Sequence, residues 1–391
     1  MEQVRPTEMD QELAKLLFEE GATLVLQDVP VGTEFGIDLA SWNTGEKFRG
    51  VKMIPPGLHF IYFSAVGKEG QAAPRTGFFK FFEKKELYAR KWDLALENFV
   101  DTSMLNTKLY QKRMKDNLKE LDQFLGAYPY DKWKKWVSLT NKISTEVLSV
   151  LEPVNQVISS VPQLESQTFR SQRNKAEATE RDTCAPTQEE IPVKRRCIQT
   201  TEEWEESLLP VMKHKEGTEL RFTQIPHTFP EGAQGADVTK YSLDSTFALE
   251  QLLSRYKREE DLLGELQFAF SCFLVGQVYD AFEQWKKLVR VICTSDAALT
   301  SKPQLFIDFV NDLYFQMQEV PADFFVDIVS RDNFLTQTLR TLFTNIEGNA
   351  QVERRLKSRA QRLQETLSAR FGWDFMEEPE DEAPVIVELD A

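Results

Sequence analysis

The feature of this 391-residue sequence that most limits its fold is a change in the spacing of apolar residues along the chain. Between residues 21 and 92, short β-branched and aromatic runs are separated by turn residues such as Pro30 and Gly32. From about residue 240 onward, apolar residues recur at intervals of three and four. The first pattern is typical of strands and the second of amphipathic helices. The sequence therefore predicts a two-domain α+β protein, with the strands first and the helices second.

The N-terminal domain, residues 1–152, is predicted to be β-rich and sandwich-like, with a helical extension at its end. Five runs have strand composition: Leu24–Leu26, Phe48–Ile54, Leu58–Ser64, Gly77–Phe82 and Glu86–Trp92. Alternation is clearest in His59–Phe63, which predicts a strand with one face more buried than the other. Helical spacing from Met114 through Leu125 and onward to Leu139 predicts the extension.

The remaining domains follow from composition. Residues 153–203 are rich in Gln, Ser, Thr, Glu and Arg, so they bury too little apolar surface to offset their ordering entropy. They are predicted to be a flexible polar linker. Residues 204–371 are predicted to be an all-α domain whose helices stack as a bundle or superhelix, with Pro303 at a helix start. No fixed sequence period is visible, so the pattern does not predict a repeat family.

Residues 372–391 form an acidic tail. Eight acidic residues follow Arg370 without an intervening Lys or Arg, and they carry about half of the net charge of −15. Such a tail suits a basic protein surface better than a phosphate backbone.

The tail ends in an apolar segment, Pro384–Leu389, that has strand composition but no neighbouring strand in the sequence. We expect it either to add as a strand to the sheet of a partner or to pack on its own chain, with the nearby acids preventing aggregation. The two interpretations stay open at this point. The predicted partner-binding residues are Trp373, Phe375, Val385, Ile386, Val387 and Leu389.

Residues that commonly bind metals or act as nucleophiles are sparse. His59, His214 and His227 have no Cys or His at metal-ligand spacing, so buried or surface histidines are expected. Cys272 and Cys293 lie in apolar helical patterns and are expected to be small buried hydrophobes. The sequence therefore predicts no metal site and no cofactor.

Acid/base chemistry also lacks a clear candidate. Glu265 and Glu283 each interrupt an apolar helix, but an acid on the wet side of an amphipathic helix looks the same, and that interpretation is favoured. Phosphate-loop, dinucleotide-binding, zinc-protease and nucleophile-elbow motifs are all missing. No catalytic residue is predicted from these patterns.

Direct binding of nucleic acid is not expected either. The stretch Tyr128–Trp136 mixes aromatic and basic residues, but Trp133 and Trp136 lie three apart and would share one helix face. Core aromatics with solvated lysines are therefore favoured. Lys194–Arg196 is interpreted as a chance cluster rather than an import signal. The net charge of −15 also opposes binding to a phosphate backbone.

Location is predicted from the absence of targeting features. The chain starts without a signal-peptide pattern, and its most apolar run, Phe268–Val278, is too short to span a bilayer. The four cysteines contain no C-x-x-C pair, which is typical of reduced cysteines in the cytosol or nucleus. We expect a protein of the cytoplasm and nucleus with no membrane partner.

Several segments resemble the AAR2 splicing factor family. They are Phe18–Thr23, Gly32–Asp38, Phe48–Gly57, Glu120–Gly126, Gly264–Phe270 and Pro321–Val329. The likeness spans both predicted domains and the tail from Trp373 to Leu389, whereas the linker is unlike the family. The resemblance implies an N-terminal β-rich domain and a C-terminal α-helical domain, in agreement with the patterns above.

The resemblance also implies a function. Members of this family are not enzymes; they assemble the U-five small nuclear ribonucleoprotein by holding the large spliceosomal scaffold protein (Prp-eight) before its RNA helicase partner joins. They bind the RNase H-like and Jab/MPN-like domains of the scaffold, and their tail supplies a strand, which would be Val385–Leu389 here. Release is linked to phosphorylation. The alternatives from other classes are an α-helical adaptor in membrane trafficking and an enzyme of unknown type.

Overall fold

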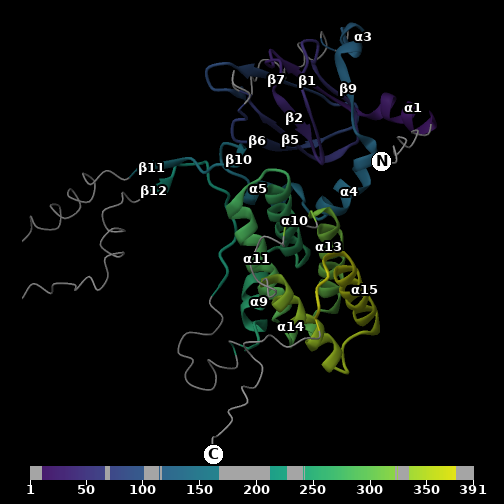
Figure 1. The fold of residues 1–391 in the computed structure, drawn as a ribbon, viewed down its shortest axis with the longest axis vertical. Helices are drawn as coiled ribbons and strands as arrows, with labels where there is room; N and C mark the ends of the chain where they lie inside the picture. The colour runs from purple at the N-terminus through teal and green to yellow at the C-terminus, as the bar shows by residue number, and fades with distance from the viewer. Residues whose placement is uncertain are drawn as a thin grey trace, which may run out of the picture. The chain divides into compact units, whose positions relative to one another are not determined.

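The computed structural model describes residues 11–66, 71–100, 114, 117–166, 212–226, 241, 243–321, 324 and 334–375. The chain divides into two compact units. The smaller unit, residues 153–155 and 162–219, contains an antiparallel pair of β11 (Leu164–Ser166) and β12 (Met212–His214). The larger unit, residues 1–152, 156–161 and 220–391, holds both the β-sheets and the helical domain (Figure 1). The predicted α+β class, with strands before helices, is confirmed.

In the described part of the chain, the N-terminal domain contains two five-stranded sheets. The first has the order β8-β7-β1-β4-β9, with β8 at Asn98–Val100, β7 at Leu87–Asp93, β1 at Ala22–Gln27, β4 at Gly50–Ile54 and β9 at Leu125–Ala127. The second has the order β10-β6-β5-β2-β3, with β10 at Ile158–Ser159, β6 at Thr76–Phe82, β5 at Gly57–Ser64, β2 at Glu34–Ile37 and β3 at Ala40–Asn43. β1 pairs in parallel with β7 and β4 with β9, while the second sheet is antiparallel throughout.

Strand β5 departs from the sequence prediction. All of its residues after Gly57 are buried, so neither face is wet. On one face, Ile61 and Phe63 pack between the two sheets; on the other, Phe60 and Tyr62 pack against helices. Alternation in the sequence correctly separates the two faces of the strand, but it does not show that helices cover the face formed by Phe60 and Tyr62.

The predicted helical extension is interrupted. Helix α3 (Leu118–Leu121) and a 3₁₀ turn, η1 (Asp122–Phe124), lead directly into strand β9, where helical spacing had predicted a continuing helix. Parallel pairing of Leu125 with Gly50 accounts for the difference, because this ladder satisfies backbone groups that a helix would bond internally. Helices α4 (Tyr130–Thr140) and α5 (Thr145–Leu151) then complete the extension.

Part of the predicted linker is ordered as a strand. Ile158 is buried, and β10 pairs with β6 at the edge of the second sheet. Residues 167–203, which make up most of the predicted linker, lie outside the described residues. The domain limits expected from composition therefore stay predictions.

The C-terminal region is helical, as expected. Its longer helices are α9 (Thr246–Leu253), α10 (Glu260–Leu274), α11 (Tyr279–Cys293), α13 (Pro303–Glu319), α14 (Phe334–Gly348) and α15 (Arg354–Phe371), with the short α12 at Ala298–Ser301. Pro303 is the first residue of α13, as predicted, because its missing N–H is not needed there. Gly372, with φ of 69°, ends α15 in the left-handed conformation.

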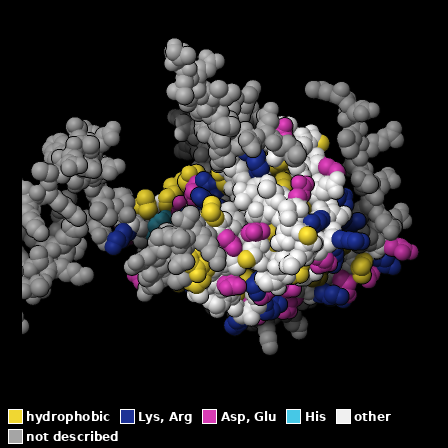
Figure 2. Space-filling view, turned by 90° about the horizontal axis from the view of Figure 1, so that it is seen from below, with side chains coloured by type: hydrophobic (Ala, Val, Ile, Leu, Met, Phe, Trp, Pro, Cys, Tyr) yellow, Lys and Arg dark blue, Asp and Glu magenta, His cyan; other side chains and the backbone are white. Residues whose placement is uncertain are grey.

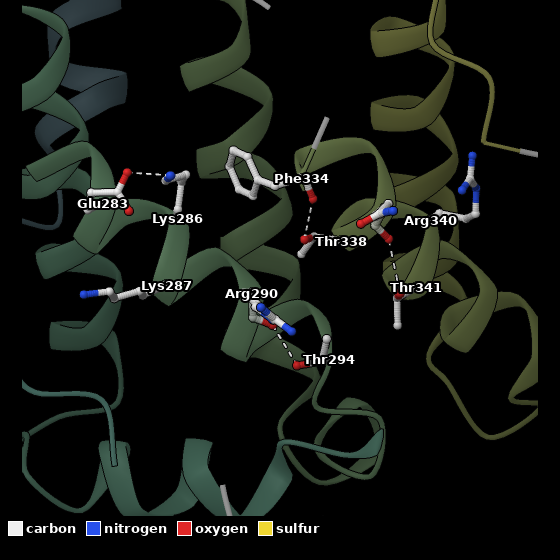
Figure 3. A pocket seen from close by; sticks show the side chains of 10 residues that line it. Glu283, Lys286, Lys287, Arg290, Thr294, Phe334, Thr338, Arg340 and Thr341 are labelled. Atoms are coloured by element: carbon white, nitrogen blue, oxygen red, sulfur yellow. Dashed lines mark hydrogen bonds and ion pairs between the residues drawn. The ribbon is translucent and has the colours of Figure 1, made fainter. Parts of the chain in front are cut away.

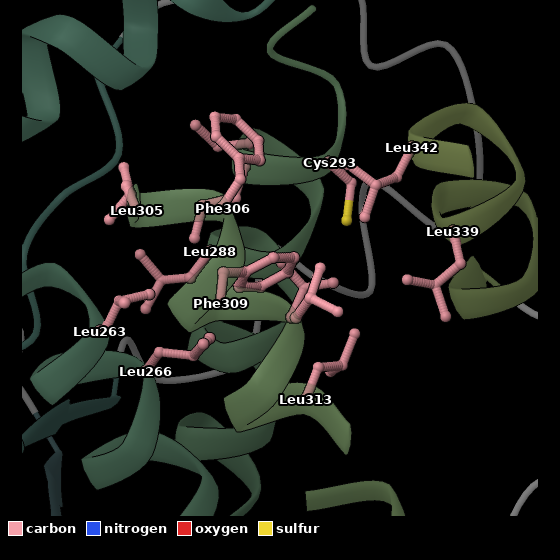
Figure 4. Packing of buried hydrophobic residues seen from close by; sticks show 14 of the residues in the cluster. Leu263, Leu266, Leu288, Cys293, Leu305, Phe306, Phe309, Leu313, Leu339 and Leu342 are labelled. Carbon is pink, nitrogen blue, oxygen red and sulfur yellow. The ribbon is translucent and has the colours of Figure 1, made fainter. Parts of the chain in front are cut away.

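The helices enclose a large apolar cluster (Figure 4). Leu263 and Leu266 of α10, Leu288 of α11 and Phe309 of α13 are among its members, and all four are at most 1% exposed. Figure 4 shows Leu339 and Leu342 of α14 facing these side chains from the neighbouring helix. The apolar stripes that were visible in the sequence therefore meet in one core.

No helix in the described part of the chain is both long and apolar enough to cross a membrane. Helix α1 (Gln11–Glu20) precedes β1.

Candidate partner-binding surfaces

A junction of polar residues holds the helical domain against the sheet domain. Lys142, between α4 and α5, places Nζ 2.8 Å from Asp312 Oδ2 on α13. Gln267 of α10 accepts a hydrogen bond from the backbone N–H of Lys142 at 2.8 Å and donates to Asn141 Oδ1 at 2.9 Å. Gly264 allows this approach, because a Cβ there would lie 2.6 Å from the carbonyl oxygen of Lys142.

Apolar and cationic contacts extend the same junction. Phe79 of β6 and Phe268 of α10 have ring centroids 5.3 Å apart. Arg75 donates to the carbonyl of Val275, just after α10, at 2.8 Å, and to Glu34 Oε1 of β2 at 2.9 Å. The two predicted domains therefore pack as one body in the larger unit.

Glu265 contradicts the prediction of a solvent-facing acid. Its side chain is fully buried, and four donors surround it. Oε1 accepts from Thr223 N and Gln284 Nε2, both at 2.9 Å, and Oε2 accepts from Thr223 Oγ1 at 2.7 Å and Tyr256 Oη at 2.6 Å. The segment around Thr223, which no periodicity marked, supplies two of these donors. The arrangement fastens that segment to α10 and α11, which is a structural role.

Glu283 is closer to the predicted setting. It lies at the surface of α11, partly exposed, and forms an ion pair of 2.5 Å with Lys286. Lys286 and a hydrogen bond from Tyr279 lower the pKa of the Glu283 carboxyl. Glu265 and Glu283 therefore have separate hydrogen-bond and ion-pair partners.

His59 is a buried structural residue, which confirms one of the two expected settings. Its Nδ1 lies 2.6 Å from Asp38 Oδ2 and its Nε2 lies 2.7 Å from the carbonyl oxygen of Pro55. Tyr128 donates to the same Asp38 oxygen at 2.6 Å, and burial raises the pKa of its hydroxyl. Both ring nitrogens of His59 are therefore occupied. His214 lies in β12, and His227 lies outside the described residues.

The cysteines in the helices are buried, as predicted. Burial raises the pKa of the thiols of Cys272 and Cys293, which disfavours the reactive thiolate. Among the described residues, no group of three or more His, Cys, Asp or Glu side chains is placed to hold a metal ion.

The aromatic-basic stretch is mostly core, as predicted. Trp136 is fully buried and donates from Nε1 to the carbonyl of Leu58 at 2.7 Å. Trp133 is partly buried and stacks on Tyr130, while the exposed Lys135 pairs with Glu319 at 2.8 Å. Trp136 is therefore a core residue, while Tyr130 and Trp133 are partly exposed. Lys194–Arg196 lies outside the described residues.

The base of the predicted binding tail is packed on the protein itself. Phe375 is 6% exposed and meets Phe343 of α14 edge to face, with centroids 5.1 Å apart. Trp373 is half-buried and stacks on Phe371 of α15. Val385, Ile386, Val387 and Leu389 lie outside the described residues. The proposal that these six residues bind a partner stays a prediction.

A basic groove between α11 and α14, of about 490 Å³, is a surface that the sequence interpretation missed (Figure 3). Lys286, Lys287, Arg290 and Arg340 line it, with Glu283 as its acidic residue. Helical spacing places Lys286 and Arg290 on one face, but the sequence does not show that α14 lies beside them. On the face shown in Figure 2, by contrast, basic and acidic side chains are interspersed.

Two family models match the sequence. One, described as the AAR2 N-terminal domain, covers residues 20–153, and the other, described as the AAR2 C-terminal repeat region, covers residues 222–376. The word "repeat" in that description was not expected, since no fixed period is visible in the sequence.

Full-length relatives agree with these matches. "Protein AAR2 homolog" of Homo sapiens is 46% identical over 393 aligned positions, which cover 98% of this chain and 97% of the relative. The protein of the same name from Caenorhabditis elegans is 38% identical and covers 93% of this chain and 97% of its own length. "A1 cistron-splicing factor AAR2" of Saccharomyces cerevisiae is 22% identical over 77% of this chain and 78% of its own length. With both domain models matched in order and relatives aligned almost end to end, this chain belongs to the AAR2 family.

Proposed function

We propose that this chain is a non-enzymatic pre-mRNA splicing factor that acts as an assembly chaperone of the U-five small nuclear ribonucleoprotein. It binds the large spliceosomal scaffold protein at its RNase H-like and Jab/MPN-like domains and delays the binding of the RNA helicase partner. The observation that carries the proposal is the alignment of 98% of the chain with a human AAR2 homolog, together with the yeast relative that is named a splicing factor.

The junction between the domains supports a scaffold-binding role. Lys142 and Asp312, together with the close approach at Gly264, hold the sheets and the helices in one relative position. Surfaces from both domains can therefore contact a large partner at the same time without an ordering cost between them. The tail would then add its strand, Val385–Leu389, to a sheet edge of the partner.

The settings of the reactive side chains support a role without catalysis. Glu265 is fully occupied by hydrogen bonds, both nitrogens of His59 are engaged, and Cys272 is buried with a raised thiol pKa. Because these groups are hydrogen-bonded or buried within the fold, none of the three is free to act as a nucleophile or a base. We infer that the protein acts where the scaffold protein is made and assembled, in the cytoplasm and the nucleus, without direct contact to nucleic acid or membrane.

Calorimetric binding to a scaffold fragment that contains the RNase H-like and Jab/MPN-like domains tests this proposal. The full chain is compared with V385P/V387P, which removes two ladder donors, and with V385I/V387I, which keeps them. We expect tight binding by the wild type and the Ile variant, and at least tenfold weaker binding by the Pro variant. Because Phe375 is part of the helical core, these substitutions are preferable to a truncation that removes it.

Each outcome has a distinct meaning. Equal affinity of the Pro and Ile variants would refute strand addition by the tail while leaving the partner in place. No binding by the wild-type chain would refute the proposed partner itself.

A further inference from the structure

The basic groove between α11 and α14 carries more positive charge than its own residues neutralise. Four cationic side chains line it, and the single carboxylate, Glu283, pairs with Lys286. Lys287 and Arg290 are exposed, and within the described part of the chain neither has a carboxylate oxygen within 4 Å. A hollow with this excess of charge favours an anionic occupant.

The groove also offers an apolar wall. Phe334, the first residue of α14, lies beside Lys286, whose Nζ is 5.4 Å from the centroid of the ring (Figure 3). Thr338 and Thr341 lie further along the same helix, and their hydroxyls donate to backbone carbonyls of α14. A flexible acidic peptide, with carboxylates for the cations and backbone for van der Waals contact, fits these walls better than a compact inorganic ion.

The end of the described chain lies against the same helix. After α15 ends at Gly372, Phe375 packs on Phe343 of α14, and Arg340 Nη2 donates to the carbonyl of Asp374 at 3.3 Å. Arg340 therefore lines the groove and also holds the start of the tail.

The sequence beyond this point is strongly acidic. Five carboxylates occur within the next seven residues: Glu377, Glu378, Glu380, Asp381 and Glu382. A chain of that length spans roughly 20 Å when extended, which exceeds the ~10 Å width of one helix. Such a short tether keeps the local concentration of the segment in the millimolar range, well above that of any free partner.

From these observations we propose that the groove between α11 and α14 binds the acidic segment 377–382 of the chain's own tail. Carboxylates of the segment pair with Lys287 and Arg290. The groove then holds the tail back until a partner takes the strand segment that follows; this second part rests on the proposed function. An acidic segment from another protein is the competing occupant that the experiment has to separate.

Carbodiimide crosslinking of the full-length chain tests the docking directly. The reagent activates a carboxylate, a lysine amine displaces the activating group as a urea, and an amide of zero added length remains. We expect mass spectrometry to find amides that join Lys286 or Lys287 to a carboxylate between Glu377 and Glu382. A mixture of ¹⁵N-labelled and unlabelled chains at low concentration distinguishes links within one chain from links between two.

A matched pair of charge-neutralising variants tests whether the crosslinks depend on the cations of the groove. K287Q/R290Q removes two exposed cations of the groove, and R354Q/R355Q removes two exposed cations from the first turn of α15. Links from Lys286 should fall at least fivefold in the first variant and stay unchanged in the second. Absence of these links in the wild type, equal yields in both variants, or links only between labelled and unlabelled chains would overturn the proposal, and the last result would identify a second copy as the occupant.

The affinity for the scaffold fragment tests the regulatory part separately. If the groove competes for the tail, K287Q/R290Q should bind the fragment about three- to tenfold more tightly than the wild type, whereas R354Q/R355Q should not. Unchanged affinity with lost crosslinks would refute competition. A wild-type chain that forms the crosslink but does not bind the fragment would refute the proposed function and leave the docking intact.

Discussion

Lys142 Nζ lies 2.8 Å from Asp312 Oδ2, and this ion pair joins two elements that are 170 positions apart in the chain. The carboxylate is almost fully buried, and Gln267 also donates to its other oxygen at 3.2 Å. The contact belongs to the junction that holds the helices to the sheet domain, so changes there report on the coupling of the two domains.

Asp312 should give the protein a measurable pH dependence. Burial raises the pKa of its carboxyl to about 6, against the opposing effect of Lys142, whereas the unfolded value is near 3.8. The folded state therefore holds the proton more tightly, and the resulting stabilisation is present at low pH and lost as the pH rises through about 6. We expect the free energy of unfolding of the wild type, relative to D312N, to fall by roughly 2 kcal/mol between pH 4.5 and 7.5.

Urea denaturation at several pH values measures this difference. In D312N, Lys142 lacks its counter-ion at every pH in the range, so this loss changes the free energy of unfolding by a constant amount. The change of the difference between wild type and D312N with pH therefore reports the titration of Asp312. A difference that does not change with pH would contradict the prediction.

Gly264 should be intolerant of a side chain. A Cβ there would lie 2.6 Å from the carbonyl oxygen of Lys142, a backbone atom that cannot rotate away. We expect G264A to lower the free energy of unfolding by about 2 kcal/mol or more, since the junction must open to accommodate the methyl group. G348A is the matched control, because a Cβ at Gly348 meets nothing within 4 Å. It should leave stability within about 1 kcal/mol of the wild type; equal effects in thermal denaturation would show that the junction is not tightly packed.

Glu265 should be essential for folding rather than for chemistry. E265A would leave four donors without their acceptor, among them the buried Gln284 Nε2 and the partly buried Tyr256 Oη, so we expect a loss of about 3 to 5 kcal/mol. E283A on the surface of α11 should cost less than about 1 kcal/mol. Urea denaturation of both variants checks the contrast, and a mild effect of E265A would mean that water replaces the carboxylate.

Phe375 should act first as a core residue. F375A removes a ring that is 6% exposed and packs on Phe343, so we expect stability to fall by about 3 kcal/mol. W373A, at a half-buried position, should cost about 1 kcal/mol. Calorimetric melting of the two variants without any partner measures the difference. If F375A melts like the wild type, the ring is free to serve a partner instead.

The elements of this protein could largely be predicted from local pattern. The helices around Leu266, Leu288 and Leu363 follow from apolar residues at helical spacing, because a helix repeats its buried face within its own sequence. Strands β1, β4, β5, β6 and β7 likewise follow from their composition and the turns between them, whereas the other five strands of the two sheets were not predicted. The acidic character of residues 374–390 is read directly from the chain.

What the tertiary structure decided is the set of contacts between elements far apart in the sequence. The second buried face of β5, the full burial of Glu265 and the pairing of Leu125 in β9 each depend on a neighbour that local spacing does not identify. The same holds for the groove, where cations on α11 become a binding surface only because α14 lies beside them. Periodicity reports which side of an element is apolar, whereas burial, charge balance and hydrogen bonding depend on what packs against that side, and that requires the folded chain.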